Sequence, residues 1–366
     1  MKLLVDGKNA FPKIIECIRE ARESILINMF IWRNDSIGNA IAKEILSAAE
    51  RGVKITLSKD RYGVVCESCE ENRKSFFNRK PSFTEKVKIS ALKLFYNREP
   101  RVTFNQTEED SGELLGAVLN HPNITVACNT NKYDHCKYYV FDNKTVIVGG
   151  INIEDKENGC DYAGRQYRDY MVMITEENAV AEFLDSLKTP GASEHFKMNI
   201  KNPVYHFGMK EAYLELIRQA EEYLTIVMAY YSPLPEFENA VISAAERGVK
   251  VKIVIPAKAN FQDSLNKKTV SRLIGKSNGK IKVCGFDGML HAKLLMSEKT
   301  ISLGSCNITK KAFGQLDELN VFVPNDERSF ALSVKASVED IFRRSKPLEA
   351  DIRYNPFMAA AESLLV

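Results

Sequence analysis

Two stretches of the chain show the same order of apolar and polar positions. Residues 11–32, "FPKIIECIREARESILINMFIW", have apolar side chains at helical spacing and then a nearly unbroken apolar run. Residues 209–231, "MKEAYLELIRQAEEYLTIVMAYY", repeat this order. Each stretch predicts an amphipathic helix followed by a buried strand. The segment "AAERGVK" then occurs at 48–54 and again at 244–250, each time before a strand-like segment. An identity of this length within one chain indicates a duplicated unit.

Each half is therefore predicted to run helix, strand, helix, strand. Apolar strands that alternate with amphipathic helices indicate an α/β fold with a buried, largely parallel sheet. Further strands are expected at 167–174 and 317–323, followed by helices at about 176–188 and about 327–344. We expect repeats at 1–190 and 204–350, joined by the Pro- and Gly-containing segment 188–203.

The first half is the longer one. From Gly52 to His135 there are 83 residues, whereas from Gly248 to His291 there are 43. We place the resulting insertion within 64–120. Part of it, residues 73–101, holds nine Lys or Arg against two Glu, with five aromatic residues interleaved. Anionic lipid headgroups or a nucleic acid strand would suit this composition, and so would a solvated face with its aromatic residues in the core.

Composition narrows the class of protein. The 366 residues are 45% hydrophobic and 27% charged, which is ordinary for a soluble globular enzyme. The formal net charge of +3 is too small to indicate a polyanion partner for the whole surface. The first apolar run is too short for a signal peptide, and no run is long enough to span a membrane. The eight Cys are expected to be reduced thiols, including the Cys-x-x-Cys at 66–69, which lacks two further zinc ligands nearby.

The candidate chemistry lies in two similar segments, "HCKYYVFDNKTVIVGGIN" (135–152) and "HAKLLMSEKTISLGSCN" (291–307). Each begins His-x-Lys on a predicted strand, with an acid seven residues after the His and a small-residue pair followed by x-Asn. Side chains at i and i+2 of a strand share a face, so each His lies beside its Lys. The segments supply the candidates His135, Lys137, Asp142 and Asn152, and His291, Lys293, Glu298 and Asn307.

The second copy departs from the first in two ways. Its acid is Glu298 where the first copy has Asp142, and its hairpin is one residue shorter. We expect the longer acid to compensate for the tighter turn, and the placement of Asn307 is left open. In the first copy, Asp134 precedes His135, and strand alternation predicts that its carboxylate points to the opposite face.

These motifs resemble the signature of the phospholipase D superfamily, His-x-Lys-x4-Asp-x6-Gly-Gly/Ser-x-Asn, present twice. The segments 32–63 and 230–256, and the Arg-Asp pair at 168–169, resemble the bacterial cardiolipin synthase branch. The resemblance covers almost the whole chain apart from the insertion and the C-terminal residues. It implies two pseudo-symmetric α/β/α repeats with one active site at their interface.

The resemblance also implies the roles of the site residues. One His, by analogy His135, attacks phosphorus and forms a phosphohistidine, while His291 protonates the leaving alcohol and then deprotonates the acceptor. Lys137 and Lys293 neutralise the phosphoryl oxygens, so neither a metal nor another cofactor is expected. The other candidates divide into phosphate donors, acids that orient the histidines, and structural acids: Asn152 and Asn307; Asp169 and Glu318; Asp142 and Glu298.

The function implied is phosphatidyl transfer of the cardiolipin synthase type, with a glycerophospholipid substrate and peripheral contact with an anionic membrane from the cytoplasmic side. The apolar-aromatic segments 28–32 and 229–235 are expected to form an apolar entrance for the second lipid. Hydrolysis to phosphatidic acid, and a nuclease acting on a nucleic acid diester, are alternatives with the same histidines. A pseudoenzyme that binds membranes or partners through the basic insertion is disfavoured, because both motifs are intact. The oligomeric state is left open.

Overall fold

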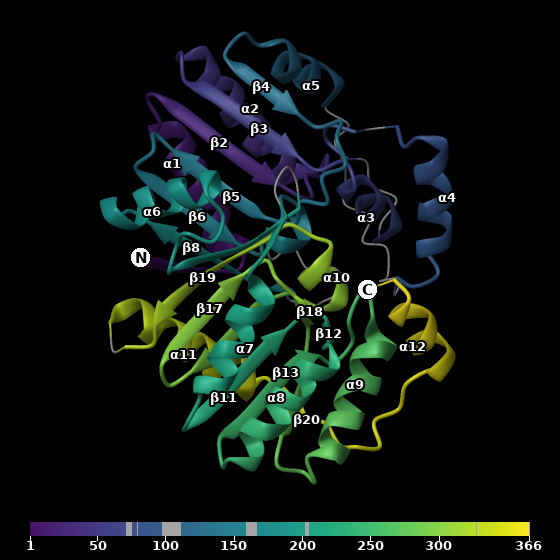
Figure 1. Ribbon diagram of the computed structural model, residues 1–366. Coiled ribbons are helices and arrows are strands. Elements are labelled where there is room, and N and C mark those ends of the chain that lie inside the picture. Colours follow the sequence, from purple (N-terminus) through teal and green to yellow (C-terminus); the bar gives the residue numbers. More distant parts are fainter. Residues whose placement is uncertain are drawn as a thin grey trace. The chain divides into compact units, whose positions relative to one another are not determined.

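The computed structural model describes residues 1–70, 75–78, 80–96, 111–158, 167–201, 205–326 and 328–365. The chain forms two compact units, Met1–Lys188 and Thr189–Val366 (Figure 1). Each unit is built around one main β-sheet with helices on both faces, so each is described by itself.

The sheet of the first unit has seven strands in the order β1-β8-β6-β5-β2-β3-β4. Its strands are β1 (Lys2–Val5), β2 (Ser24–Met29), β3 (Lys54–Lys59), β4 (Ile124–Ala127), β5 (Lys137–Phe141), β6 (Thr145–Gly149) and β8 (Tyr170–Ile174), and a short strand β7 (Tyr167–Arg168) precedes β8. The helices are α1 (Gly7–Glu20), α2 (Ser36–Glu50), α3 (Gly63–Glu70), α4 (Phe83–Leu92), α5 (Ser111–Asn120) and α6 (Glu177–Lys188), with a 3₁₀ turn at Asp155–Asn158.

The second unit repeats this sheet. Its order β9-β19-β17-β16-β11-β13-β14 matches that of the first unit, and β10 and β20 extend the two edges. The strands are β9 (Phe196–Ile200), β10 (His206–Phe207), β11 (Tyr223–Met228), β13 (Lys250–Pro256), β14 (Lys282–Phe286), β16 (Lys293–Ser297), β17 (Thr300–Gly304), β19 (Glu318–Pro324) and β20 (Ser345–Pro347), with short strands β12 (Tyr231–Ser232), β15 (Met289–Leu290) and β18 (Ile308–Thr309). The helices are α7 (Met209–Gln219), α8 (Pro235–Glu246), α9 (Asp263–Lys276), α10 (Lys310–Gly314), α11 (Ser329–Arg343) and α12 (Pro356–Ser363).

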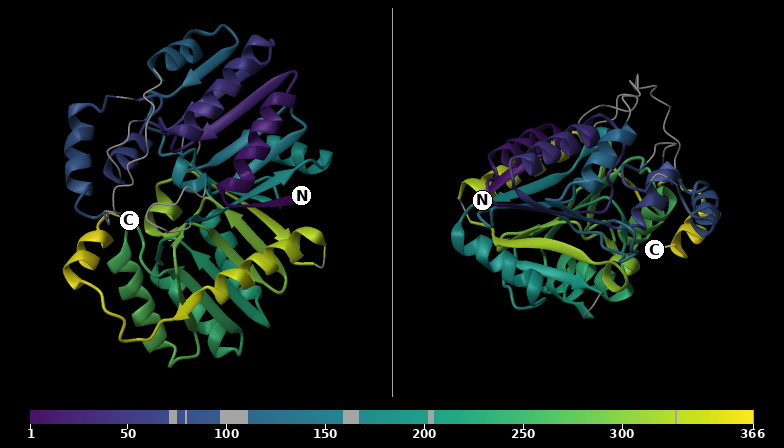
Figure 2. Two further views of the ribbon diagram at one scale, coloured as in Figure 1. Left: turned by 180° about the vertical axis from the view of Figure 1, so that it is seen from behind. Right: turned by 90° about the horizontal axis from the view of Figure 1, so that it is seen from above.

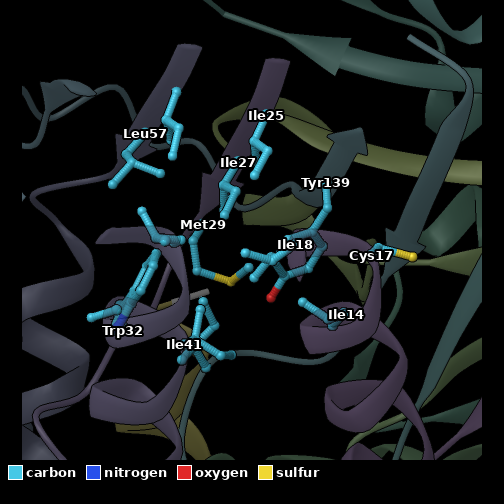
Figure 3. Packing of buried hydrophobic residues seen from close by; sticks show 14 of the residues in the cluster. Ile14, Cys17, Ile18, Ile25, Ile27, Met29, Trp32, Ile41, Leu57 and Tyr139 are labelled. Carbon is cyan, nitrogen blue, oxygen red and sulfur yellow. The ribbon is translucent and has the colours of Figure 1, made fainter. Parts of the chain in front are cut away.

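Side chains that alternate along the strands point to opposite faces of each sheet. Tyr139 on β5 packs with Ile14 and Ile18 of α1 in one large cluster, which Figure 3 shows together with residues of β2, β3 and α2. The neighbouring Tyr138 points to the other face and meets the ring of Phe183 on α6, with centroids 5.5 Å apart. The second unit shows the same layering, and Figure 2 shows α11 lying across the face of the sheet that is seen from behind.

The repeated segment "AAERGVK" has a structural explanation. In both copies it ends a helix, and its glycine adopts a left-handed backbone, with φ of 95° at Gly52 and 97° at Gly248. The preceding arginines bind the carbonyl groups that end the previous helix: Arg51 donates to Ile18 and Arg19 of α1, and Arg247 to Ile217, Arg218 and Ala220 at the end of α7. The identity therefore preserves a helix end rather than a catalytic group.

The prediction of a largely parallel sheet is wrong. Only β2–β3–β4 and β11–β13–β14 are parallel among the described main-sheet strands. The His-x-Lys hairpin and the strands after it join in antiparallel order. A short turn can connect only antiparallel strands, so each hairpin forces the sheet to become mixed.

Two of the expected boundaries also differ from the structure. The expected linker 188–203 contains β9, which pairs with β19 and buries Phe196 and Met198. Since β1 pairs with β8 in the same way, each repeat begins with a strand before its first helix. Within the expected insertion, α5 connects β3 to β4 as α9 connects β13 to β14, so α5 belongs to the repeat and the inserted helices are α3 and α4.

The C-terminal segment packs on the second unit. Helix α12 buries Ala359 and Glu362 against α9. The carboxylate of Glu362 accepts a hydrogen bond of 2.7 Å from the backbone amide of Leu265 in the first turn of α9. A carboxylate at a helix N-terminus is favourable because it meets unpaired amides and the positive end of the helix dipole. Phe357 on α12 and Leu364, directly after it, are exposed.

Candidate active site

Each His-x-Lys motif begins a strand in the middle of its sheet. Lys137 and Lys293 are the first residues of β5 and β16, and both ammonium-bearing side chains are almost fully buried. His291 is 8% exposed, and His135 is half-buried. Burying an ammonium group is unfavourable unless charged or polar groups surround it, so a buried lysine beside a histidine is typical of a site for an anion.

Each lysine folds back toward its own histidine. The Nζ atom of Lys137 donates a hydrogen bond of 2.6 Å to the backbone carbonyl of His135. Lys293 donates to the carbonyl of His291 in the same way. The two motifs therefore share one local geometry, in which the cation lies at the backbone of the imidazole-bearing residue.

An aromatic ring lies against each histidine. The rings of Phe30 and His135 meet edge to face with centroids 4.8 Å apart, and those of Tyr230 and His291 do so at 6.3 Å. The Nζ atom of Lys137 also lies 5.3 Å from the centroid of the Phe30 ring. Both aromatic residues come from the segments for which we expected an apolar entrance. The other aromatics there, Trp32 and Tyr231, belong to the buried cores of their units, so they offer no exposed entrance.

The acids that follow the motifs lie against the second small residue of each motif. A Cβ atom added to Gly150 would lie 2.5 Å from both carboxylate oxygens of Asp169, so a larger residue here would displace this acid. In the second unit, Ser305 occupies the equivalent place and its hydroxyl donates a hydrogen bond to Glu318. Asp169 and Glu318 are 1% and 0% exposed. The small-residue pairs thus make room for, or bind, the buried acids.

The motif acids hold each hairpin to the start of a neighbouring strand. Asp142 accepts hydrogen bonds from the backbone amides of three consecutive residues, Arg22, Glu23 and Ser24, at 2.8–2.9 Å. Glu298 accepts from the equivalent residues, Glu221, Glu222 and Tyr223, at 3.0–3.3 Å. Each motif acid therefore binds the backbone of its own unit and fastens its hairpin there.

The pKa of both acids reflects these bonds. Desolvation by partial burial raises the pKa of Asp142 and of Glu298, but the hydrogen bonds from backbone amides outweigh it, and the pKa of each lies below its ordinary value. An ionised carboxylate is therefore the form that fastens the hairpin.

The one-residue difference between the hairpins is absorbed in the turn. Lys137 pairs with Gly149 across β5 and β6. The register of β16 and β17, in which Leu294 pairs with Leu303, places Lys293 opposite Gly304. In the longer turn Asp142 and Asn143 both adopt positive φ, 51° and 52°. The longer side chain of Glu298 thus reaches the equivalent amides of its own unit from the shorter turn.

The two asparagines differ in their surroundings. The Oδ1 atom of Asn152 accepts a hydrogen bond of 3.3 Å from the backbone amide of Ile31. The Oδ1 atom of Asn307 is buried and has no hydrogen-bond partner within the described part of the chain. Because the amide oxygen of Asn152 accepts this bond, its NH₂ group is the end that can donate a hydrogen bond.

Asp134, the residue before His135, turns its carboxylate to the strand backbone. It accepts a hydrogen bond of 2.9 Å from the amide of Cys136, and burial raises its pKa. Cys136 is buried, as is Cys306 in the second motif. In the Cys-x-x-Cys segment, Cys69 packs with Val65 and Ile89, while Cys66 is partly exposed.

Two further carboxylates, which were missed from the sequence, hold the loop before the first motif and the acid that follows it. Asp60, after β3, accepts backbone hydrogen bonds from Tyr62, Lys132 and Asp134 at 2.7–2.9 Å. Asp6, after β1, exchanges backbone hydrogen bonds with Asp169 through its carboxylate and its amide. Both residues end a strand next to a turn, and that is the only local signal for them.

The comparisons with known proteins identify the family. A family model described as "Cardiolipin synthase, PLD-like domain" matches residues 14–189 and 213–344. Cardiolipin synthase B of Escherichia coli (strain K12) is 24% identical over 367 residues, covering 93% of this chain and 80% of that protein. A minor cardiolipin synthase of Bacillus subtilis (strain 168) is 23% identical, covering 95% of this chain and 82% of that protein.

Solved structures show the same fold. A phosphatidylserine synthase of Haemophilus influenzae Rd KW20 aligns with a TM-score of 0.67 at 16% identity, covering 100% of this chain and 91% of that one. A polyphosphate kinase of Porphyromonas gingivalis aligns with a TM-score of 0.58 at 13% identity, covering 100% of this chain and 52% of that one. At these identities the likeness concerns the fold alone.

Two α/β repeats that each carry a His-x-Lys hairpin define a duplicated phospholipase D-like protein. Since the family model covers most of the chain, the chain belongs to the family of cardiolipin synthase, PLD-like domains, and it is an enzyme of the phospholipase D superfamily. The resemblance expected from the motifs and the fold of two phospholipase D-like repeats are confirmed.

Proposed function

We propose that this enzyme transfers a phosphatidyl group between alcohols through a phosphohistidine intermediate. The observation that carries the proposal is the duplicated geometry, in which each unit holds a buried lysine at the backbone of a histidine. A ping-pong transfer needs one imidazole as nucleophile and a second as acid and base, together with cations for the phosphoryl oxygens. The proposal therefore requires both motifs to act on the same phosphodiester.

In the first half of the reaction, an imidazole nitrogen of His135 forms a bond to phosphorus. The bond from phosphorus to the leaving alcohol oxygen breaks, and His291 gives this oxygen its proton. In the second half, His291 takes the proton of the acceptor hydroxyl, whose oxygen bonds to phosphorus as the bond to His135 breaks. The atoms balance, and His291 ends the cycle protonated as it began.

The other site residues support this chemistry. Lys137 and Lys293 bear fixed positive charge toward the phosphoryl oxygens, where charge increases in the transition state. Asn152 and Asn307 donate hydrogen bonds to the same oxygens. Asp169 and Glu318 orient the imidazoles by accepting from their second ring nitrogen, the role that an acid plays in a catalytic triad. Asp142 and Glu298 keep the hairpins in place.

The relatives named cardiolipin synthase favour a glycerophospholipid as both donor and acceptor. With phosphatidylglycerol, the products would be cardiolipin and glycerol. Among the residues that the structure describes, no helix combines the length and apolar character needed to cross a bilayer. We propose that the enzyme reaches its lipid by peripheral contact with an anionic membrane surface.

The test is incubation of the purified enzyme with vesicles that contain phosphatidylglycerol as the only lipid, followed by mass spectrometry of the products. Cardiolipin and glycerol as main products, with phosphatidic acid minor, support transfer. Because water is present at about 55 M, a transferase must hold the acceptor at an effective concentration that exceeds it, which positioning can achieve. Phosphatidic acid as the main product identifies a hydrolase. Cleavage of single-stranded DNA without either lipid product identifies a nuclease.

A further inference from the structure

Helix α4, one of the two inserted helices of the first unit, has an apolar face that the described part of the chain leaves uncovered. Phe83, Val87 and Leu94 are 81%, 56% and 75% exposed, and Ala91 is exposed between them. Positions 83, 87 and 91 follow one another at helical spacing, and Leu94 lies in the turn just after α4 ends at Leu92. These four residues are here called the α4 apolar stripe. A contiguous exposed apolar stripe on a folded protein indicates a binding surface.

The opposite face of α4 is firmly attached to the unit. Ile89 packs with Val65 and Cys69 of α3. Glu85 receives two hydrogen bonds from Arg61, at 2.8 and 2.9 Å, which lower the pKa of Glu85 to about 2. Ser82 and Glu85 form a capping box at the start of the helix. The exposed stripe is therefore the outer side of a helix whose inner side is already satisfied.

Positive charge borders the stripe. Lys86 and Lys88 lie on opposite sides of it on the helix, and both are exposed, as is Lys80 before the helix. The only acid within α4 is Glu85, and its carboxylate is turned inward to Arg61. An apolar stripe bordered by lysines on a helix too short to cross a bilayer is the pattern of a helix that lies in a membrane interface.

We infer that α4 is a membrane-docking helix that places the α4 apolar stripe in the surface of an anionic phospholipid bilayer, with the lysines on the headgroups. A symmetric contact with a second copy of the chain would bring these lysines together, which is unfavourable. The inference rests on the proposed function for its choice of partner, because a phospholipid-processing enzyme must contact a lipid surface. It assigns that contact to named residues.

Vesicle binding tests the inference without turnover. The full chain is sedimented with vesicles of phosphatidylcholine alone, and with vesicles of equal parts phosphatidylglycerol and phosphatidylcholine. We expect F83S/L94S to lower the partition coefficient on the mixed vesicles at least about tenfold, since two large apolar side chains no longer enter the interface. K86E/K88E should lower it at least about fivefold for each lysine, and less at high salt. Leu119→Ser on α5 and Leu332→Ser on α11, also at exposed leucines, should bind like the unaltered chain.

A fluorescence measurement locates the contact independently. The chain has a single tryptophan, Trp32, which is 1% exposed. Val87→Trp therefore adds a surface reporter, and its emission should shift to the blue with mixed vesicles, whereas Leu119→Trp should not shift. Unchanged binding of F83S/L94S, or no shift for Val87→Trp, overturns the inference. Loss of self-association in F83S/L94S with vesicle binding intact identifies a second copy as the occupant instead.

The vesicle-binding test can be distinguished from the test of the proposed function. His135→Ala should bind the mixed vesicles like the unaltered chain, because its imidazole is not part of α4. If the α4 variants lose vesicle binding while the unaltered enzyme makes no lipid product, the docking inference stands and the proposed function fails. If lipid products form and the α4 variants bind vesicles normally, the proposed function stands and the docking inference fails.

Discussion

Asp60 accepts a hydrogen bond of 2.9 Å from the backbone amide of Asp134, the residue immediately before His135. The same oxygen accepts from Lys132 at 2.8 Å, and the other oxygen accepts from Tyr62 at 2.7 Å. Asp60 therefore fastens the loop that delivers His135 to the end of β3. A buried carboxylate with these three bonds is a positioning residue for the proposed nucleophile.

We predict that Asp60→Asn lowers kcat at least about tenfold with little change in KM, because an amide cannot accept all three bonds and a displaced nucleophile loses its alignment. Steady-state kinetics on a soluble short-chain phosphodiester gives both constants. Asp35→Asn is the matched control, since Asp35 is another buried carboxylate and caps α2. Equal kcat values in the two variants would show that Asp60 supports folding alone.

The second prediction concerns the room that Gly150 leaves for Asp169. Gly150→Ala should lower kcat by roughly a hundredfold or more, because its new Cβ would occupy space within 2.5 Å of both carboxylate oxygens. Ser305→Ala should have a smaller effect, about tenfold, since it removes one hydrogen bond to a buried carboxylate without a clash. The kinetic assay above measures both.

Gly116→Ala is the control for this pair. A Cβ at Gly116, on α5, would meet nothing within 4 Å. It should leave kcat unchanged and raise the thermal midpoint slightly, because alanine favours a helix more than glycine does. A Gly150→Ala enzyme as active as Gly116→Ala would contradict the placement of Asp169.

These residues show which parts of the site can be predicted from sequence. His135, Lys137, Asp142 and Asn152 lie in one hairpin, so their spacing alone fixes which of them share a face. Asp60 acts on a residue 74 positions away, and no local pattern reports such a contact. The same holds for the amides of Arg22 to Ser24, which lie about 120 positions from Asp142.

The elements of the fold also differ in how well the sequence predicts them. Amphipathic helices such as α1 and α7 carry a strong periodic signal, because one face is buried along several turns. Strand β9 has only five residues, and its buried Phe196 and Met198 stand within a polar segment that contains Pro and Gly. Whether a strand pairs in parallel or antiparallel order depends on its neighbours in the sheet, so the mixed order could not be read from apolar runs.

The third prediction follows from the pKa of Asp142 and Glu298, which is lowered in the folded enzyme. A lowered pKa adds stability that is present above the unfolded pKa, near 4, and is lost as pH falls through the folded value. Asp142→Asn should therefore cost about 1–3 kcal/mol of unfolding free energy at neutral pH and little at acidic pH. Glu298→Gln should behave likewise.

Urea unfolding across the acid range measures this dependence. Asp185→Asn is the control, because Asp185 is exposed on α6 and forms an ion pair with the exposed Lys188. Its unfolding curve should follow that of the unaltered enzyme at each pH. A constant difference between Asp142→Asn and the unaltered enzyme at all pH values would show that ionisation of this acid does not contribute.

The fourth prediction concerns metal ions. If Lys137 and Lys293 supply the positive charge for phosphoryl transfer, removal of metal ions with EDTA should leave kcat unchanged. Lys137→Met and Lys293→Met, which keep side-chain length without charge, should each lower kcat by at least about a hundredfold. Lost activity that returns on titration with Mg²⁺ or Zn²⁺ would show that lysines alone do not carry the charge.

The last prediction separates the roles of the two histidines. His135→Ala and His291→Ala should each lower kcat by at least about a thousandfold on a phospholipid substrate, because nucleophile and acid cannot replace each other within one step. A p-nitrophenyl phosphodiester needs no acid for its leaving group. With this substrate, His291→Ala should release a burst of p-nitrophenol and retain a phosphoryl adduct on His135, since no base activates the acceptor. His135→Ala should show neither burst nor adduct. Peptide mass spectrometry after a rapid quench locates the adduct; an adduct on His291 alone would reverse the assignment, and full activity of either variant would contradict the two-histidine mechanism.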